Sequence, residues 1–389
     1  MLSLKFDRQR KMIYSDDQST IDSLKNGEFG QIGEGRQLML DPEEALYLLD
    51  VRNAECKDQS GNTVTFNGYA ATFASSRKFM ARYFTYKDWR DRGLIAKDSK
   101  YLQKVRPSGQ VPSKRYPATR LKMLGGKAEG IFFPADMTTI VEDEKEGKGL
   151  YEKYWIGQYG TYKVSDHGSL NKLDIFETLF LMENGQLTLT NYPKQEVSDL
   201  ASKWRSDFFK LYQVYADWRE KGYVVKTGFK FGTHFRIYFP GASPMKTEGN
   251  WLHSKHVVHV FPRDVKMLIS EWARAIRVAH SVRKTFILAI PGKSRKKKLG
   301  IDFVLFHRKG GNIEKPSTDK PKYAMLSLSE NEYMGGSELS AIINEAKMHK
   351  LELIIAIADR ETAVTYYKAR RIELPGSEYE YYEIDWIQP

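Results

Sequence analysis

Apolar and polar positions follow one another along the chain in patterns that predict helices and strands in turn. Apolar residues recur at helical spacing in residues 40–50 and again in residues 173–183, which predicts an amphipathic helix in each range. Each range is followed by a second helical pattern that ends at a glycine cap, Gly93 or Gly222, and a strand is expected after each cap. Helices that alternate with strands place the chain in a mixed α/β class.

The later part of the chain continues the same alternation. Residues 255–261 are strand-like, residues 265–277 predict a helix, and the apolar run 286–290 is typical of a buried strand. The last segment repeats this order, with a helix expected at 338–348 and the sequence LIIAI at 353–357. Because LIIAI matches FILAI at 286–290, the two stretches predict the same helix followed by the same strand.

A longer internal repeat shows how these elements are organised. Residues 86–97 (YKDWRDRGLIAK) recur as residues 215–226 (YADWREKGYVVK) with six of twelve positions identical. The first copy lacks the continuation that follows the second copy, whereas the C-terminal segment resembles that continuation alone. The sequence therefore predicts an N-terminal half-unit, a whole unit and a C-terminal half-unit.

The totals are those of a globular protein with more than one core. A chain of 389 residues exceeds an ordinary single domain, and 41% hydrophobic with 28% charged residues excludes a disordered chain. Its apolar runs fall short of the roughly 20 residues that a membrane-spanning helix needs. Cys56 is the only cysteine, which excludes an internal disulfide and a cysteine-rich zinc site. No secretory signal is visible near the first residues, so a cytoplasmic protein is expected.

Positive charge is concentrated in the first three quarters of the chain. The formal net charge is +12, although residues 323–389 hold six Lys and Arg against twelve Asp and Glu. Residues 99–128 carry eight basic side chains and no acidic one, and a second basic cluster covers residues 293–298. Either cluster alone reads equally well as a solvated face. Together with 13% aromatic residues they favour binding to a phosphate backbone.

Three motifs in fixed order carry candidate chemistry. Residues 222–238 (GYVVKTGFKFGTHFRIY) precede LHSKH at 252–256 and HSVRK at 280–284. This set resembles the catalytic core of the archaeal tRNA-splicing endonucleases, also called tRNA-intron lyases. The resemblance is close from about residue 150 to residue 310 and weaker on either side of that range.

The resemblance implies both an activity and a set of site residues. Members of this family cut intron-containing precursor tRNA within a bulge-helix-bulge fold, leaving a 2′,3′-cyclic phosphate and a 5′-hydroxyl, with no metal or other cofactor. The tyrosine, histidine and lysine of the family triad correspond here to Tyr238, His253 and Lys284. The family also sandwiches a bulge base between two side chains. Arg277 corresponds to the first of them, and Arg308 is our prediction for the second.

The family plan also gives meaning to the half-units. Four units usually assemble, each with an N-terminal α/β subdomain and a restriction-nuclease-like C-terminal α/β subdomain, and two of the four are catalytic. Here Leu351 falls where Lys284 would be in the last half, so one inactive unit is expected to be split around one active unit, and a homodimer would rebuild the plan. An acidic loop with Asp359 and Glu361 is a candidate dimer contact. The expected domains are a non-catalytic half-unit, two subdomains of the catalytic unit, a linker and a structural half-unit, at residues 1–125, 126–222, 223–310, 311–322 and 323–389.

The side-chain chemistry is consistent with that implied reaction. Attack by a ribose 2′-hydroxyl needs a proton acceptor, a proton donor for the leaving 5′-oxygen, and positive charge near the phosphate. Histidine can donate a proton near neutrality, and lysine stays charged. Tyrosine is a poor base unless nearby cations lower its pKa. Tyr238 is therefore expected either to act as the base or to position the 2′-hydroxyl.

Each residue also has a structural reading. Tyr238 alone fits an interfacial aromatic, and Lys284, just before a buried strand, fits a side chain that reaches the surface. His253, His256 and His259 suggest a metal site, but strand alternation places His256 on the opposite face from the other two. His234 and His280 are expected to be structural. A metal-dependent nuclease would need convergent carboxylates, which residues 229–287 do not supply, and a non-catalytic RNA-binding subunit is the more serious alternative.

Overall fold

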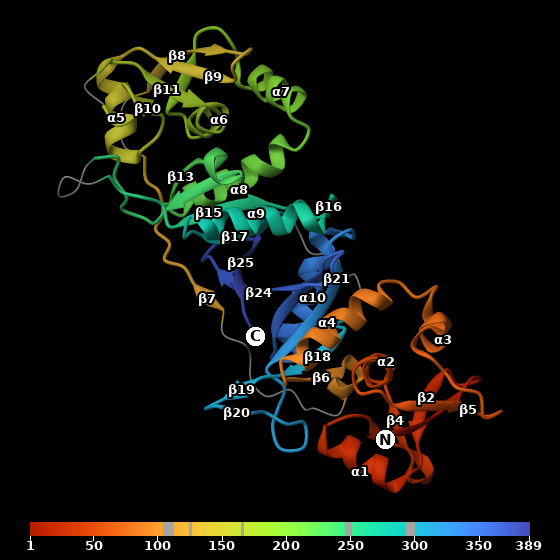
Figure 1. Ribbon diagram of the computed structural model, residues 1–389. Coiled ribbons are helices and arrows are strands. Elements are labelled where there is room, and N and C mark those ends of the chain that lie inside the picture. The colour runs from red at the N-terminus through yellow and green to blue at the C-terminus, as the bar shows by residue number, and fades with distance from the viewer. Residues whose placement is uncertain (104–112, 124–126, 165–166, 246–250, 293–299) are drawn as a thin grey trace.

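The computed structural model describes residues 1–103, 113–123, 127–164, 167–245, 251–292 and 300–389. Figure 1 shows an elongated molecule, with an α/β lobe at each end and a long sheet between the lobes. None of the described helices is both long enough and apolar enough to cross a membrane. The mixed α/β class predicted from the sequence is confirmed.

The two lobes have sheets with the same strand order. In the N-terminal lobe the order is β3-β4-β2-β1-β5, and in the second lobe it is β10-β11-β9-β8-β12. The first sheet contains β1 (Ser3–Asp7), β2 (Met12–Ser15), β3 (Gln31–Ile32), β4 (Leu38–Leu40) and β5 (Glu55–Asp58). The second contains β8 (Ala128–Phe133), β9 (Thr138–Val141), β10 (Gln158–Tyr159), β11 (Asn171–Asp174) and β12 (Leu187–Leu189). This shared topology supports the duplication that the sequence predicts.

The helices of the two lobes repeat in the same order. The first lobe holds α1 (Gln18–Asn26), α2 (Pro42–Val51), α3 (Phe66–Ala70) and α4 (Phe79–Asp91), and the second holds α5 (Glu144–Tyr154), α6 (Ile175–Glu183), α7 (Lys194–Trp204) and α8 (Phe208–Glu220). Helices α2 and α6 both begin at an aspartate with a capping box. Gly93 and Gly222 follow α4 and α8 with φ of 75° and 82°, a conformation that favours glycine and ends a helix. Short 3-10 helices lie at Glu34–Arg36, Ala71–Phe73, Ser99–Gln103 and Phe229–Phe231.

One long sheet joins the lobes. Its strands follow the order β13-β14-β15-β17-β25-β24-β23-β21-β18-β6, and β7 (Lys114–Arg115) pairs with β24. The four strands at one end are β13 (Val224–Thr227), β14 (Phe235–Tyr238), β15 (His256–Val260) and β17 (Thr285–Ile290). The others are β25 (Glu380–Ile387), β24 (Val364–Glu373), β23 (Glu352–Ala358), β21 (Tyr323–Ser329), β18 (Phe303–Phe306) and β6 (Ile95–Asp98). The C-terminal strand β25 therefore pairs with β17 of the whole unit.

Two helices pack at the middle of this sheet. Helices α9 (Ile269–Ser281) and α10 (Gly336–Met348) bury Trp272 and Leu339 in one apolar core over the central strands. The helix predicted at 265–277 begins later than expected, because β16 (Lys266–Leu268) pairs with β22 (Tyr333–Gly335) instead. An exposed hairpin, β19 (Arg308–Lys309) with β20 (Asn312–Ile313), projects from the sheet near β18 (Figure 1).

Strand pairing shows that one of the two units is divided along the sequence. Strand β6 pairs with β18, and Ile95 faces Phe306 in the same antiparallel register in which Val224 faces Tyr238. Residues 1–98 and 302–389 thus form one unit, here called the split unit, and residues 128–290 form the whole unit inserted into it. Strand β18 lies inside the range 223–310 predicted for the catalytic subdomain, yet it pairs with strands of the split unit. The range 311–322, expected as a linker, includes β20.

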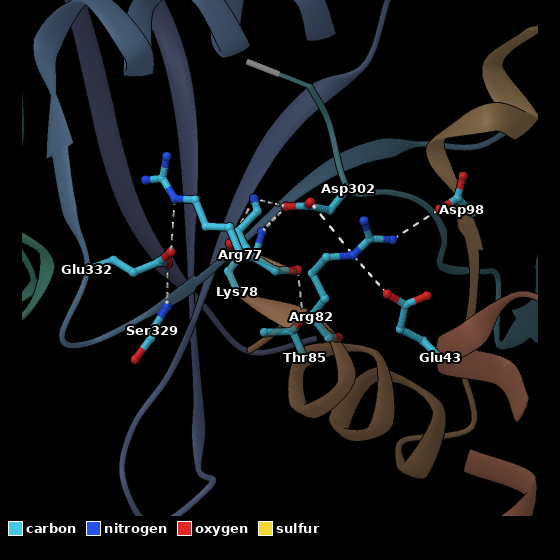
Figure 2. A network of polar contacts seen from close by, with 10 residues as sticks. Glu43, Arg77, Lys78, Arg82, Thr85, Asp98, Asp302, Ser329 and Glu332 are labelled. Atoms are coloured by element: carbon cyan, nitrogen blue, oxygen red, sulfur yellow. Dashed lines mark hydrogen bonds and ion pairs between the residues drawn. The ribbon is translucent and has the colours of Figure 1, made fainter. Parts of the chain in front are cut away.

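A buried ionic network ties the two halves of the split unit together (Figure 2). Arg82 of α4 lies 2.8 Å from Glu43, 3.0 Å from Asp98 and 3.9 Å from Asp302. Lys78 pairs with Asp302 at 2.6 Å. Asp302 belongs to the C-terminal half, whereas Glu43, Lys78, Arg82 and Asp98 belong to the N-terminal half. The network therefore holds together segments that are separated by the whole unit.

Replacing Arg82 with methionine is expected to lower the free energy of unfolding by about 3–5 kcal/mol, because it leaves buried carboxylates without a partner. Burial already raises the pKa of Glu43, and Arg82 opposes that rise. The loss should therefore be largest at neutral pH and should shrink as the pH falls and the carboxylates become protonated. Urea denaturation measures the effect. Arg77→Met is the control, since Arg77 is mostly exposed and lies 3.9 Å from Glu332. Equal losses in the two variants would contradict this account.

Candidate active site

Tyr238, His253 and Lys284 come together in the whole unit. All three line one cavity of about 440 Å³, although they lie on β14, on the segment before β15, and just before β17. The lobe of the whole unit also lines this cavity, with residues that include Trp155 of the segment after α5. Three motifs that are separated in sequence therefore form one site.

Tyr238 is the last residue of β14. Alternation along the strand buries Phe235 and Ile237 in the apolar core and turns Arg236 and Tyr238 toward the cavity. The Tyr238 ring is itself buried, and its centroid lies 4.6 Å from that of Trp155. Burial raises the pKa of Tyr238, and the positive charge of Arg236 acts in the opposite direction.

Lys284 is held by the chain segment that carries His253. Its ammonium group donates a hydrogen bond to the carbonyl oxygen of Ser254 and another, at 3.2 Å, to the Ser254 hydroxyl. The nitrogen also lies 4.5 Å from the centroid of the Phe231 ring. Burial lowers the pKa of Lys284, and the charge of Arg236 lowers it further. An ammonium has three donors, so one N–H remains for a bound ligand.

His253 is exposed and borders the cavity. His234 accepts a hydrogen bond from the Val260 amide at 2.9 Å through Nδ1, and burial lowers its pKa to about 3. His280 lies 3.1 Å from the carbonyl oxygen of Ile384 through Nε2. Of the histidines in the described ranges, His253 alone lines the cavity, which fits the expectation that His234 and His280 are structural.

His256 and His259 do not converge with His253. The ring of His256 packs against Phe239, whereas the ring of His259 lies 4.5 Å from that of His234 on the other face of β15. Burial lowers the pKa of each to about 4. Among the residues that the structure describes, no group of three or more His, Cys, Asp or Glu side chains is arranged to hold a metal ion.

Two carboxylates of the cavity have a structural role. Glu177 pairs with Lys226 at 2.6 Å and accepts a hydrogen bond from the Gly157 amide at 2.9 Å. Asp174 begins helix α6, and burial beside Glu177 raises its pKa to about 7.

The split unit repeats this arrangement at its own equivalent positions. Glu44 pairs with Lys97 at 2.9 Å and accepts from the Gly30 amide at 3.0 Å, and the pKa of Asp41 is likewise raised to about 7 by burial. Because the unit without the triad keeps the same carboxylates, we assign them to the fold.

The split unit departs from the whole unit at the triad positions. The paired registers place Phe306 at the position of Tyr238, and Leu351 precedes β23 as Lys284 precedes β17. Counting back three residues from the matching strand β21 places Lys320 at the position of His253. The sequence-based assignment of Leu351 to the lysine position agrees with this register.

The remaining predicted site residues lie outside the cavity. Arg277 is exposed on α9, and Arg308 is exposed on β19, where its guanidinium donates to the Arg92 carbonyl oxygen at 2.9 Å. Asp359 and Glu361 lie in the turn between β23 and β24, and the Asp359 carboxylate accepts from the Glu361 and Ala363 amides at 2.9 Å. Both residues are exposed, and the Asp359 carboxylate stabilises the turn.

The basic stretches are described only in part. Residues 293–298 and 104–112 lie outside the described residues. Lys114 of the first stretch pairs with Glu383 at 2.6 Å, so its charge is partly balanced within the fold. Of residues 161–172, Tyr162, Lys163 and Lys172 line the cavity.

Sequence reasoning missed two side chains of the site. Arg236 lies two residues before Tyr238, and strand alternation alone was enough to place it beside that tyrosine. Trp155 comes from another subdomain, more than eighty residues earlier in the chain, so no local pattern links it to Tyr238.

Comparison with known proteins agrees with this fold. Residues 208–299 match the family model "tRNA intron endonuclease, catalytic C-terminal domain", and residues 7–70 match "tRNA intron endonuclease, N-terminal domain". The tRNA-splicing endonuclease of Methanopyrus kandleri is 37% identical over 150 residues, which are 37% of this chain and 80% of that protein. The chain belongs to the tRNA-splicing endonuclease family.

Longer alignments extend the similarity beyond the whole unit. The tRNA-splicing endonuclease of Methanosarcina barkeri is 28% identical over 348 residues, covering 74% of this chain and 94% of that protein. The enzyme of the same name from Methanococcoides burtonii is 36% identical over 187 residues, covering 45% of this chain and only half of that relative's length. The alignment with the Methanosarcina barkeri protein covers more of the chain than the whole unit alone contains, so it includes part of the split unit as well.

Proposed function

We propose that this protein cuts intron-containing precursor tRNA at the intron boundaries, within a bulge-helix-bulge fold. The convergence of Tyr238, His253 and Lys284 on one cavity carries the proposal, and the similarity to tRNA-splicing endonucleases supports it. Incubation with an intron-containing precursor tRNA, followed by mapping of the cut positions, tests the proposal. An intron-free tRNA of the same sequence is the matched control, and cleavage of both RNAs at the same rate would contradict it.

The proposed reaction is a transesterification that needs no metal. The ribose 2′-hydroxyl attacks the adjacent phosphorus, the bond from phosphorus to the 5′-oxygen breaks, and a 2′,3′-cyclic phosphate and a 5′-hydroxyl result. His253 donates its proton to the leaving 5′-oxygen, a role that its exposed position at the cavity permits. Tyr238 either takes the proton of the 2′-hydroxyl or orients that hydroxyl for attack. In the first case the phenolate of Tyr238 gains the proton of the 2′-hydroxyl and His253 loses one to the 5′-oxygen; in the second case solvent water takes the proton of the 2′-hydroxyl.

Lys284 supplies positive charge where negative charge develops on the phosphate. Two of its donors are held by Ser254, which fixes the nitrogen next to His253 and leaves one donor for a phosphate oxygen. Burial lowers its pKa, yet the group needs to remain charged at neutral pH to do this. A bound phosphate would favour the charged form by direct attraction.

We propose a non-catalytic role for the split unit. Phe306, Lys320 and Leu351 replace the tyrosine, the histidine and the lysine of the triad, so the unit lacks all three groups that the reaction uses. It extends the central sheet through β25, and its basic hairpin β19–β20 lies on the surface. The alternative considered for the whole protein was a non-catalytic RNA-binding subunit. Under our proposal that role belongs to the split unit alone.

Arg277 and Lys284 are expected to affect cleavage in different ways. Under our proposal Arg277 and Arg308 stack on a bulged base supplied to another subunit's site, a contact of about 1–3 kcal/mol that does not depend on base identity. Arg277→Ala should therefore slow cleavage most where the bulge is suboptimal. Lys284→Ala should slow cleavage of every substrate alike, because it removes charge from the transition state. Single-turnover rates on well-formed and relaxed bulges measure this, and a uniform loss in both variants would remove Arg277 from the base contact.

A homodimer is proposed, with the acidic turn as a contact. Asp359 and Glu361 are expected to face a basic surface of the second copy, so Glu361→Lys should weaken the dimer through charge repulsion. Asp359 also holds its own turn, and Asp359→Lys would disturb that turn in addition. Sedimentation at several protein concentrations measures the monomer fraction of each variant. A dimer that neither variant weakens would exclude these two residues from the interface.

A further inference from the structure

Arg236 lies beside the triad but has no part in the mechanism described above. It is two residues before Tyr238 on β14, on the same face of the strand, and both side chains line the cavity. The guanidinium carbon lies 5.9 Å from the centroid of the Tyr238 ring. Its positive charge also acts on Lys284 across the cavity. Arg236 is therefore close enough to share a ligand with both residues.

One donor of the Arg236 guanidinium is not used within the described part of the fold. Its Nε is buried and has no hydrogen-bond partner among the residues that the structure describes. Its neighbour Lys226, by contrast, pairs with Glu177 and donates a hydrogen bond to the Gly157 carbonyl oxygen at 2.8 Å. A buried donor without a partner costs free energy unless a ligand satisfies it. The lack of a partner thus points to a ligand that accepts hydrogen bonds and carries negative charge.

The split unit provides an internal comparison. The register that pairs Ile95 with Phe306 places Val304 at the position of Arg236, just as it places Phe306 at the position of Tyr238. The structural pair Lys226 and Glu177, in contrast, is kept as Lys97 and Glu44. Arg236 is therefore lost together with the triad and not retained with the fold.

We propose that Arg236 is a further catalytic residue, whose guanidinium donates hydrogen bonds to a non-bridging oxygen of the scissile phosphodiester. The inference rests on the proposed function, since it concerns the same reaction at the same cavity. Arginine suits this role because its planar fork matches two phosphate oxygens and its charge persists at any working pH. Arg236 and the remaining donor of Lys284 would both contact the phosphate while negative charge builds up on the phosphate oxygens. The field of Arg236 on Tyr238 also opposes the effect of burial on that group's pKa.

The first test is the single-turnover cleavage rate. Arg236→Gln is expected to slow cleavage about 100- to 1,000-fold, the usual effect of removing one donor from a developing oxyanion. Arg236→Lys keeps the charge but not the fork, so it should fall between the wild type and the glutamine variant. The matched control is Lys172→Gln, which removes one charge from the rim of the same cavity, on strand β11. RNA binding and thermal unfolding are measured alongside for each variant.

The second test uses substrates in which sulfur replaces either non-bridging oxygen at the cleavage site, as separate Rp and Sp forms. Wild-type protein and Lys172→Gln should cleave one form more slowly than the other, and Arg236→Gln should lose most of that difference. Arg236→Lys, which retains a cation there, should keep part of it even if the glutamine variant is unstable. Unchanged cleavage rates in both Arg236 variants, or an unchanged Rp-to-Sp ratio in both, would overturn the inference. The proposed function would still stand in that case, because wild-type protein cleaves the RNA. A wild-type protein that leaves the RNA intact would overturn both.

Discussion

His253→Ala is expected to slow cleavage about 100- to 10,000-fold, the contribution of a positioned general acid, with little change in RNA binding. The side chain is exposed at the cavity and belongs to the segment that Lys284 holds through Ser254. Its loss removes the proton donor for the leaving 5′-oxygen without opening a cavity in a core. Single-turnover rates at saturating protein measure the chemical step, and filter binding measures the affinity.

His234→Ala is the control for that variant. His234 accepts a hydrogen bond from the Val260 amide and packs against His259, so its loss should lower the free energy of unfolding. The cleavage rate of the folded variant should fall far less than that of His253→Ala. Wild-type cleavage by His253→Ala would remove His253 from the mechanism, and a larger loss at His234 would mean that the wrong histidine has been assigned.

Tyr238→Phe is expected to show the second large loss, also about 100- to 10,000-fold if the phenol is the general base. Only the hydroxyl group is removed, and the ring can still pack against Trp155. Phe306 occupies the same register position in the split unit, so phenylalanine fits this site of the fold. The variant should therefore fold normally, which a thermal unfolding curve checks.

The pH dependence of cleavage separates the two roles of Tyr238. Burial raises its pKa, so the phenolate fraction grows as the pH rises from neutral to alkaline, and a rate limited by this base should rise with it. Tyr238→Phe should then lose both the rate and its increase with pH. A variant that loses rate but keeps the increase would assign Tyr238 to positioning of the 2′-hydroxyl. A variant with the wild-type rate and profile would exclude Tyr238 from both roles.

Local patterns were enough to predict much of the fold. Gly93 and Gly222 follow α4 and α8 with positive φ, as the sequence predicted. A single glycine after a helical pattern is enough to predict the end of a helix, because glycine favours the left-handed conformation found there. The repeat of residues 86–97 predicted a duplication, and both lobes have the same strand order. These features depend on short segments, where spacing and side-chain type decide the structure.

Long-range pairing was beyond such reasoning. The pairing of β25 with β17 depends on which apolar strands meet across the centre of the molecule, and apolar runs alone do not encode their partners. Helix α9 starts later than predicted because Lys266–Leu268 pairs with a strand nearly seventy residues later in the chain. Arg308 falls within the range 223–310 that was expected for the catalytic subdomain, although β18, just before it, pairs with β6 of the split unit.

In the candidate site, too, some residues could be predicted from local motifs and others could not. Tyr238, His253 and Lys284 were found because motifs in a fixed order identify them, and the structure brings them to one cavity. The contact of Trp155 with Tyr238 and the ion pair of Lys226 with Glu177 each join two subdomains, so only the structure shows them. Contacts of that kind depend on tertiary packing and leave no periodic signal in the sequence.

The central claim is that the triad cleaves a bulged precursor tRNA without a metal ion. Wild-type protein and His253→Ala are incubated with precursor tRNA in excess chelator, and the ends of the products are identified chemically. The account predicts wild-type cleavage at the intron boundaries, a 2′,3′-cyclic phosphate on the upstream product, a 5′-hydroxyl on the downstream product, and almost no cleavage by the variant. Cleavage that stops in chelator, or products with 3′-hydroxyl and 5′-phosphate ends, would contradict it.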